Sequence, residues 1–382
     1  MQFRIETQTS PAYTGGVRDS CPCRLDAIHT APSPPPSPPA PHAPRHVPAL
    51  DGWRGLAIVC LLLGHFFPVP GINLGLVGVH LFFVLSGLLM TRILFLQKAP
   101  LPLFYRRRIA RIFPSVYFYL PVVTAVYLAC GRPVDLFELA TAASFTNNYL
   151  TNGTPWTMPF GHIWSLSVEE HAYVLLSIVA IASRATLAGG IRAVGIATAA
   201  IVLVACVYAT VFAGRWTGLW DNSEVAAFGI FASGLLLLLG ARGRPGPSSR
   251  VLPAMLVPGL MLLGLAAHWW SLPRVVHLLA GCGAFALAVN ALDRAPSFLR
   301  SVLEWPPLRQ LGTWSFSLYL WQQPFYQLVR HEGLHPAPGL GLSLIVGVAA
   351  FHLVEQPARD YLNRRWSASA RRSDDAQASP LA

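Results

Sequence analysis

The sequence predicts an all-α, polytopic membrane protein with about ten transmembrane helices. Hydrophobic residues make up 53% of the 382-residue chain, and charged residues make up only 12%. An ordinary soluble domain is about 25% charged, and a disordered chain combines low hydrophobicity with high charge. The composition therefore excludes both classes. The apolar residues also form long blocks separated by short basic loops, and a transmembrane helix needs about 20 mostly apolar residues.

These blocks divide the chain into three expected parts. Residues 1–48 form a tail that we expect to be disordered, because nine of the eighteen residues from Ala31 to Pro48 are proline. Residues 49–360 form the expected transmembrane domain, and residues 361–382 form a short polar tail that we also expect to be disordered. The expected spans are 51–69, 75–97, 112–130, 163–182, 193–213, 222–241, 251–268, 275–292, 310–329 and 338–355.

The basic residues predict the topology. With the N-terminus placed in the cytoplasm, the inner loops hold thirteen basic residues and the outer loops hold four. This asymmetry follows the positive-inside rule and predicts that both termini are cytoplasmic. The same pattern explains the net charge of +11, so we expect no nucleic acid partner.

The cysteines do not indicate a metal site. Cys21 and Cys23 form a single CxC pair in the tail, and the other four cysteines lie far apart in or beside apolar segments. Without a second pair, a CxC motif is weak evidence for metal binding, so we expect no metal.

Two titratable residues lie on the first expected helix. Arg54 and His65 are eleven residues apart, which places them on one helix face about 16 Å apart along the axis. Such groups are costly in a bilayer and are therefore candidates for a functional site. Two structural interpretations stay open: Arg54 snorkels to the inner interface, or His65 hydrogen-bonds a neighbouring helix.

The third expected helix begins with a basic cluster. Arg108 and Arg111 are three residues apart and share a helix face. They act either as an inner charge anchor or as an anion clamp, since guanidinium groups suit phosphate geometry.

The segment before the fourth expected helix is long, aromatic and rich in asparagine and threonine, as is typical of a carbohydrate-facing surface. Asn148, Trp164 and Ser167 are the candidate substrate-binding residues there. The spacing of Ser167 and Glu170 also fits a capping box at a helix start. Glu170 then enters an apolar helix, so we expect an arginine or histidine from another helix to pair with it.

Taken together, six strings resemble the acyltransferase-3 family of integral membrane O-acyltransferases. The strings are LDGWRGLAIVCLLLGH, GVHLFFVLSG, FYRRRIARIFP, WSLSVEE, SFSLYLWQQP and LVEQPAR, and they span Leu50 to about Arg359. The family's Arg-x10-His motif corresponds to Arg54 and His65, and its Arg-x-x-Arg motif corresponds to Arg108 and Arg111.

The family's Ser-x-x-Glu segment corresponds to Ser167 and Glu170. The chain departs from the family at His80, where members often carry aspartate. We expect the His80 side chain to lie near His65 or at the outer interface. The chain also departs at the string WQQP, from Trp321 to Pro324, where a WHWP-like string is frequent. With no esterase-like domain, it resembles the stand-alone form.

The resemblance implies an enzyme of the inner (plasma) membrane that transfers an acyl group, commonly acetyl, from acyl-CoA to a hydroxyl group. The acceptor is a sugar, a surface polysaccharide or a glycosylated metabolite. Arg108 and Arg111 are expected to bind the acyl-CoA phosphates, and His65 to act as general base or to carry the acyl group briefly. Arg54 is expected to hold the donor or stabilise developing charge, and Glu170 to orient an arginine or histidine.

Two other classes of protein are compatible with parts of this pattern. A transporter or flippase for a lipid or sugar also has many helices and buried polar residues, but its inverted repeats are not evident in this sequence. A structural scaffold is disfavoured by the buried arginine, histidine and glutamate residues, since each is costly without a function.

Overall fold

The computed structural model describes residues 47–150, 158–183, 186–212, 217–243 and 255–366. The described part is helical, and its only strand-like pairing is an isolated bridge between Ile72 and Trp269. The expected all-α class is therefore confirmed. The tails, with Cys21 and Cys23, lie mostly outside the described residues. The helices are α1 (Pro48–Phe66), α2 (Leu74–Thr91), η1 (Arg92–Leu96), α3 (Leu101–Ala129), α4 (Leu136–Ala143), α5 (Asn147–Leu150), η2 (Gly161–Ile163), α6 (Trp164–Ala182), α7 (Leu187–Val211), η3 (Thr217–Asp221), α8 (Ser223–Ala226), α9 (Phe228–Arg242), α10 (Leu256–Ala266), α11 (Arg274–Val276), η4 (His277–Cys282), α12 (Gly283–Asn290), η5 (Leu292–Arg294), α13 (Ser297–Leu303), α14 (Pro306–Glu332), α15 (Pro336–Ala350) and η6 (Phe351–Glu355).

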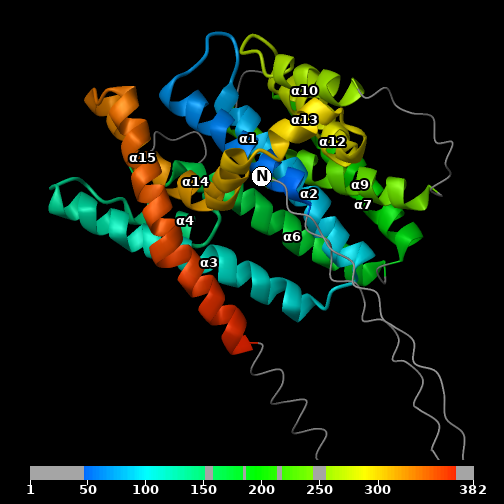
Figure 1. The fold of residues 1–382 in the computed structure, drawn as a ribbon, viewed down its shortest axis with the longest axis horizontal. Coiled ribbons are helices and arrows are strands. Elements are labelled where there is room, and N and C mark those ends of the chain that lie inside the picture. Colours follow the sequence, from blue (N-terminus) through cyan, green and yellow to red (C-terminus); the bar gives the residue numbers. More distant parts are fainter. Residues whose placement is uncertain (1–46, 151–157, 184–185, 213–216, 244–254, 367–382) are drawn as a thin grey trace, which may run out of the picture. The chain divides into compact units, whose positions relative to one another are not determined.

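Helix α1 lies at the centre of this unit. It packs mainly against α2 and α14, while α14 packs against α15 and α2 against α9. Figure 1 shows α15, α3 and α4 on one side of these central helices and α7, α9, α10 and α12 on the other. The most central helix is therefore the one that carries both Arg54 and His65.

Close contacts between glycines and neighbouring backbones hold α1 in place. A Cβ atom on Gly55 would overlap the carbonyl oxygen of Leu308, and one on Gly312 would overlap the carbonyl oxygen of Asp51. Small residues of this kind allow two membrane helices to approach at backbone distance. On the other side of α1, Gly64 packs against the backbone of Gly75 at the start of α2. The positions of Arg54 and His65 are thus fixed by backbone contacts on both sides.

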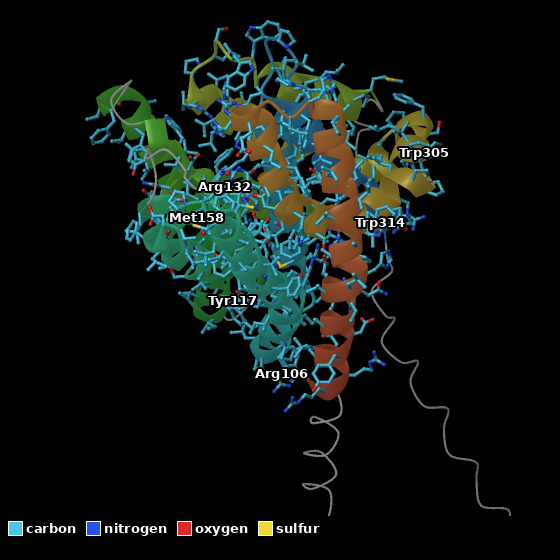
Figure 2. The ribbon with its side chains drawn as sticks, turned by 90° about the vertical axis from the view of Figure 1, so that its left-hand side faces the viewer. Arg106, Tyr117, Arg132, Met158, Trp305 and Trp314 are labelled. Carbon is cyan, nitrogen blue, oxygen red and sulfur yellow. The ribbon has the colours of Figure 1, made fainter. Side chains whose placement is uncertain are left out.

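Helix α3 begins eleven residues before the expected start at 112. Pro102 occupies the first turn, where its missing N–H group has no intrahelical partner to lose. The arginine-rich stretch then continues the helix, because arginine is a good helix former. Figure 2 shows Arg106 at the end of α3 beside the C-terminal end of the long helix that includes α15. That helix extends to Trp366, so the expected C-terminal tail begins later than residue 361.

Seven helices of the described part are long and apolar enough to cross a membrane. The protein is therefore a multi-span membrane protein. The other three expected spans coincide with α10, with the α11–α12 stretch and with α14, but the first two are shorter. Helix α14 is long but carries buried polar groups such as Gln322 and Ser317. The count of ten and the cytoplasmic termini stay predictions.

Candidate active site

His65 is held by two side chains of α14. Its Nδ1 is 2.9 Å from Oε1 of Gln322 on α14, and its ring stacks on Tyr326 with the centroids 4.4 Å apart. The amide oxygen of Gln322 is only an acceptor, so Nδ1 of His65 carries the hydrogen. The amide nitrogen of Gln322 donates in turn to Oε1 of Gln323 at 3.1 Å, which fits this orientation of the amide. The neutral imidazole therefore keeps its lone pair on Nε2.

The Nε2 side of His65 faces the start of α2. A Cβ atom added to Gly75 would lie 3.3 Å from Cδ2 and 3.4 Å from Nε2 of the ring. Glycine at this position leaves room for the basic nitrogen. Because Nδ1 is committed to Gln322, Nε2 is the atom that can accept a proton from a bound hydroxyl group.

A pocket surrounds this imidazole, and we call it the outer pocket. Its lining comes from α1, α2, η2, α6, η3, α11 and α14, and includes His65, Trp164, Asp221 and Arg274. Asp221 lies in the η3 turn outside the seven candidate spans, and burial raises the pKa of its carboxyl group to about 6, partly offset by Arg274. The pocket thus combines an aromatic ring with neutral and charged polar groups, a combination suited to a polar organic ligand.

A second pocket, the inner pocket, collects the arginines. Arg54, Arg108 and Arg111 line it together with apolar side chains of α2, α3 and α6. Arg54 has only a long contact with Asp51, 3.7 Å between the charged atoms, and the described residues give Arg111 no ion pair or hydrogen bond. Glu169 also lines this pocket, so three guanidinium groups face one carboxylate in the lining. The pocket therefore presents an excess of positive charge beside an apolar wall, which suits an anionic ligand with an apolar arm.

Glu170 pairs with Arg108, as the sequence predicted for a partner from another helix. The two charged atoms are 3.1 Å apart, and the guanidinium group also lies over the ring of Tyr173, 3.5 Å from its centroid. Glu170 lines neither of the two pockets. Its neighbour Glu169 lines the inner pocket and accepts a hydrogen bond of 2.7 Å from Ser86. Glu170 thus acts on the inner pocket only by holding Arg108, whereas Glu169 lines the pocket itself.

One wall separates the two pockets, because Val79 and Tyr319 line both. The Tyr319 hydroxyl lies 2.6 Å from Oγ of Ser165 and donates to the carbonyl oxygen of His162. Tyr319 is 6% exposed, which rules out a position in an interfacial aromatic belt. Its ring is therefore anchored between the arginines and His65.

Of the three expected substrate-binding residues, only Trp164 lines a pocket. Asn148 is buried and donates to Oγ of Ser223 at 3.0 Å. Ser167 is fully buried and donates to Oδ1 of Asn147 at 2.7 Å and to the carbonyl oxygen of Ile163.

The capping-box interpretation of Ser167 and Glu170 is wrong, because α6 already begins at Trp164 and has no side-chain cap. Ser167 lies inside the helix, where it bonds back to the preceding turn. These bonds hold the connection before α6 in place.

His80 does not approach His65. Its Nδ1 lies 2.8 Å from Nε2 of His268, and Nδ1 of His268 lies 2.7 Å from the carbonyl oxygen of Gly264. The residue that replaces the family's frequent aspartate therefore belongs to a separate buried histidine pair.

Among the described residues, no group of three or more histidine, cysteine or acidic side chains is arranged to hold a metal ion.

Sequence reasoning missed several residues that contact His65 or line the pockets. Gln322 was visible only as a departure from a family string, and nothing local in that string indicates a contact with a helix 257 positions earlier. Glu169 had a usable signal, since Ser165, Glu169 and Tyr173 recur every four residues and all line the inner pocket.

Comparisons with known proteins place the chain in a family. The acyltransferase domain of the acyltransferase-3 family matches residues 47–354. The chain is 26% identical to the putative peptidoglycan O-acetyltransferase YrhL of Bacillus subtilis, over 82% of this chain and 55% of YrhL. It is 27% identical to the putative membrane-bound transacylase BcsY of Komagataeibacter xylinus, over 82% of this chain and 83% of BcsY. The peptidoglycan O-acetyltransferase OatA of Listeria monocytogenes is 24% identical, over 82% of this chain and 56% of OatA.

The chain thus spans little more than half of YrhL and OatA but most of BcsY. No solved structure matches it. The family match covers the central helices and every residue of the two pockets. The chain therefore belongs to the acyltransferase-3 family of membrane acyltransferases.

Proposed function

We propose that the protein transfers an acyl group, commonly acetyl, from acyl-CoA to a hydroxyl group of a sugar, surface polysaccharide or glycosylated metabolite. The observation that carries this proposal is the pair of adjoining pockets, one lined by three arginines and the other by His65, with Tyr319 in both linings. The names of YrhL and OatA, which describe O-acetyl transfer to peptidoglycan, support the acetyl group and a glycan acceptor.

The inner pocket suits the donor. In the described part of the chain, no carboxylate pairs closely with Arg111 or Arg54, and Arg108 adds a third guanidinium group held by Glu170. Arginines of this kind bind phosphate oxygens by charge-assisted hydrogen bonds. The apolar wall beside them suits the pantetheine arm, and its thioester end would extend past Tyr319 toward the outer pocket.

The outer pocket suits the chemistry. Nε2 of His65 accepts the proton of the acceptor hydroxyl while the hydroxyl oxygen attacks the thioester carbonyl carbon. The carbon–sulfur bond breaks, and the CoA thiolate leaves with the electron pair and receives the proton from the imidazolium. An alternative order, in which His65 first carries the acyl group on Nε2, uses the same atoms. In either case the hydrogen bond to Gln322 keeps Nδ1 protonated.

The topology gives this proposal a direction. With both termini in the cytoplasm, the arginine end of α1 faces the cytoplasm and His65 lies toward the outer face of the plasma membrane. Donor and acceptor would then enter from opposite sides and meet at the wall formed by Tyr319.

Release of CoA by the purified protein tests the proposal. The protein in detergent is mixed with acetyl-CoA and an oligosaccharide acceptor, and free thiol and acetylated product are measured. We expect turnover by the wild type, and a loss of about 10²- to 10⁴-fold in His65→Ala, the usual contribution of a general base. The matched control is His331→Ala, because His331 is an exposed histidine at the end of α14.

A transporter or flippase, the competing function, would move its ligand across vesicles without releasing thiol. Full thiol release by His65→Ala would remove the assignment of His65 as the base. No thiol release by the wild type with any acceptor, together with ligand transport in vesicles, would replace the enzyme by the transporter.

A further inference from the structure

His162 is a buried histidine that the proposed mechanism does not use. It lies in the short η2 helix before α6, is 6% exposed and lines the outer pocket together with His65. Neither ring nitrogen has a hydrogen bond of standard geometry among the described residues, although the backbone of Leu320 lies close enough to interact with the ring. Its ring lies between two tyrosines, with centroids 5.7 Å from Tyr119 and 5.2 Å from Tyr319. It is therefore a packed imidazole with most of its hydrogen-bonding capacity unused.

This arrangement is unusual for a structural histidine. Buried polar atoms are nearly always paired, and each one left unpaired needs an explanation. His80 and His268, buried in the same unit, satisfy each other through a bond of 2.8 Å. His162 has equal burial and no such bond, and it differs from that pair in lining the pocket of the candidate base. This contrast favours a ligand group as the partner of His162.

A neutral imidazole offers one N–H donor and one lone pair. A hydroxyl group complements both functions, because it accepts one hydrogen bond and donates another. His65 is already assigned to the reacting hydroxyl, so His162 is left for a second hydroxyl close to it. Asp221 and Arg274 line the same pocket and offer a carboxylate and a guanidinium group to hydroxyls further along the ligand.

We propose that His162 is a specificity residue that hydrogen-bonds the hydroxyl next to the reacting one, so that the outer pocket selects vicinal diols, as found in sugars, over simple alcohols. This inference rests on the proposed function, because it names a preference among acceptors of the same transfer. His162 would position the acceptor and would not exchange a proton with the reacting atoms.

Two small acceptors that differ by one hydroxyl group test the proposal: trans-1,2-cyclohexanediol and cyclohexanol. Purified wild-type protein in detergent is assayed for acetyl transfer from acetyl-CoA to each, and kcat/KM values are compared. We expect the wild type to prefer the diol by about tenfold, the loss that follows when one hydrogen bond to a buried polar group is missing. His162→Phe keeps the ring volume but removes both polar atoms. It should bring the two acceptors to within about twofold, because kcat/KM should fall more for the diol than for cyclohexanol.

His162→Gln supplies an amide donor and acceptor and should restore part of the diol preference, which also covers the case in which the phenylalanine variant folds poorly. His331→Phe is the matched control, since it changes an exposed histidine. An equal fall with both acceptors in His162→Phe and His162→Gln would make His162 a structural residue and overturn the proposal. An unchanged diol preference in His162→Phe would also overturn it, since a water molecule or backbone group would then satisfy the ring. Absence of acetyl transfer by the wild type to both acceptors and to the oligosaccharide would instead contradict the proposed function.

Discussion

The inner and outer pockets lie on either side of one tyrosine, yet they offer opposite kinds of interaction. The inner pocket is lined by guanidinium groups that stay charged at every physiological pH. The outer pocket is lined by imidazoles that need to be neutral to accept protons, with a single arginine–aspartate combination at Arg274 and Asp221. We therefore expect substitutions in the inner pocket to change donor binding, and substitutions in the outer pocket to change the rate of proton transfer.

After the loss of the candidate base His65, the largest effect is expected for the inner pocket. Replacing Arg108 and Arg111 together by alanine should raise the KM for acyl-CoA by about 100-fold or more, since each charge-assisted hydrogen bond contributes about 1.5–3 kcal/mol. Turnover at saturating donor should change much less. The measurement is initial rate against acyl-CoA concentration, with the double variant of the exposed neighbours Arg106 and Arg107 as control.

Arg111→Ala alone separates binding from folding. Removal of Arg108 leaves Glu170 without its partner, and breaking a buried ion pair costs about 3–5 kcal/mol of stability. Arg111 has no such pair among the described residues, so its single variant should keep the wild-type melting temperature and still raise the KM. An unchanged KM in Arg111→Ala and in the double variant would contradict a phosphate-binding role.

Substitutions beside His65 at the outer pocket should lower kcat. Gln322→Leu removes the acceptor that fixes the His65 tautomer, so a fraction of the imidazoles would present N–H instead of a lone pair at Nε2. We expect kcat to fall by about 10- to 100-fold, as for other residues that orient a catalytic or metal-binding histidine, with the KM for acyl-CoA unchanged. Gln310→Leu, on an exposed position of the same helix, is the control. A change confined to KM would place Gln322 with the donor-binding residues.

A smaller effect is expected from the space beside the imidazole. Gly75→Ala would place a methyl group 3.3 Å from Cδ2 of His65, and the ring has to move by a few tenths of an ångström. Since displacements of about 1 Å cost about 10²-fold in rate, we expect a loss of about three- to tenfold in kcat. Gly341→Ala, where a Cβ atom meets no other atom within 4 Å, should have no effect on rate. Equal rates in both variants would mean that Nε2 does not need this space.

The smallest expected effect is a pH dependence of the melting temperature, and we expect it to arise from the outer pocket alone. The pKa of Asp221 is about 6 in the folded protein, against an ordinary value of 3.8 that applies to the unfolded chain. Between these values the folded state binds more protons than the unfolded state, so stability falls as the pH rises through this window. We expect the melting temperature to drop by a few degrees from pH 4 to pH 7 and Asp221→Asn to flatten this dependence. An identical pH profile in the variant would exclude Asp221 as the titrating group.

The fold was predictable to the extent that it is written in local composition. The apolar blocks predicted the helices. The eleven-residue spacing predicted that Arg54 and His65 share a face of one helix, and that helix is the central one. The start of α3 was missed because the arginine-rich stretch was assigned to a loop. In the structure these arginines belong to a helix that begins at Leu101.

The site was less predictable because it depends on contacts between distant segments. A capping-box pattern at Ser167 is compatible with two positions along a helix, and only the contacts with Asn147 and Ile163 decide between them. Gln322 contacts His65, and His162 lines the outer pocket, through the packing of α14 and η2 near α1. Nothing in their own neighbourhoods in the sequence specifies that packing.

The anchored ring of Tyr319 has a consequence for the energy supply of the cell. A continuous watery path from the arginines to the histidines would let protons leak across a membrane that stores about 2.3 kcal/mol per charge for each 100 mV. The Tyr319 hydroxyl is held by Ser165 and by the carbonyl oxygen of His162, and its ring lines both pockets. In the proposed topology, this fixed ring would stand between the two polar cavities and keep the membrane electrically sealed.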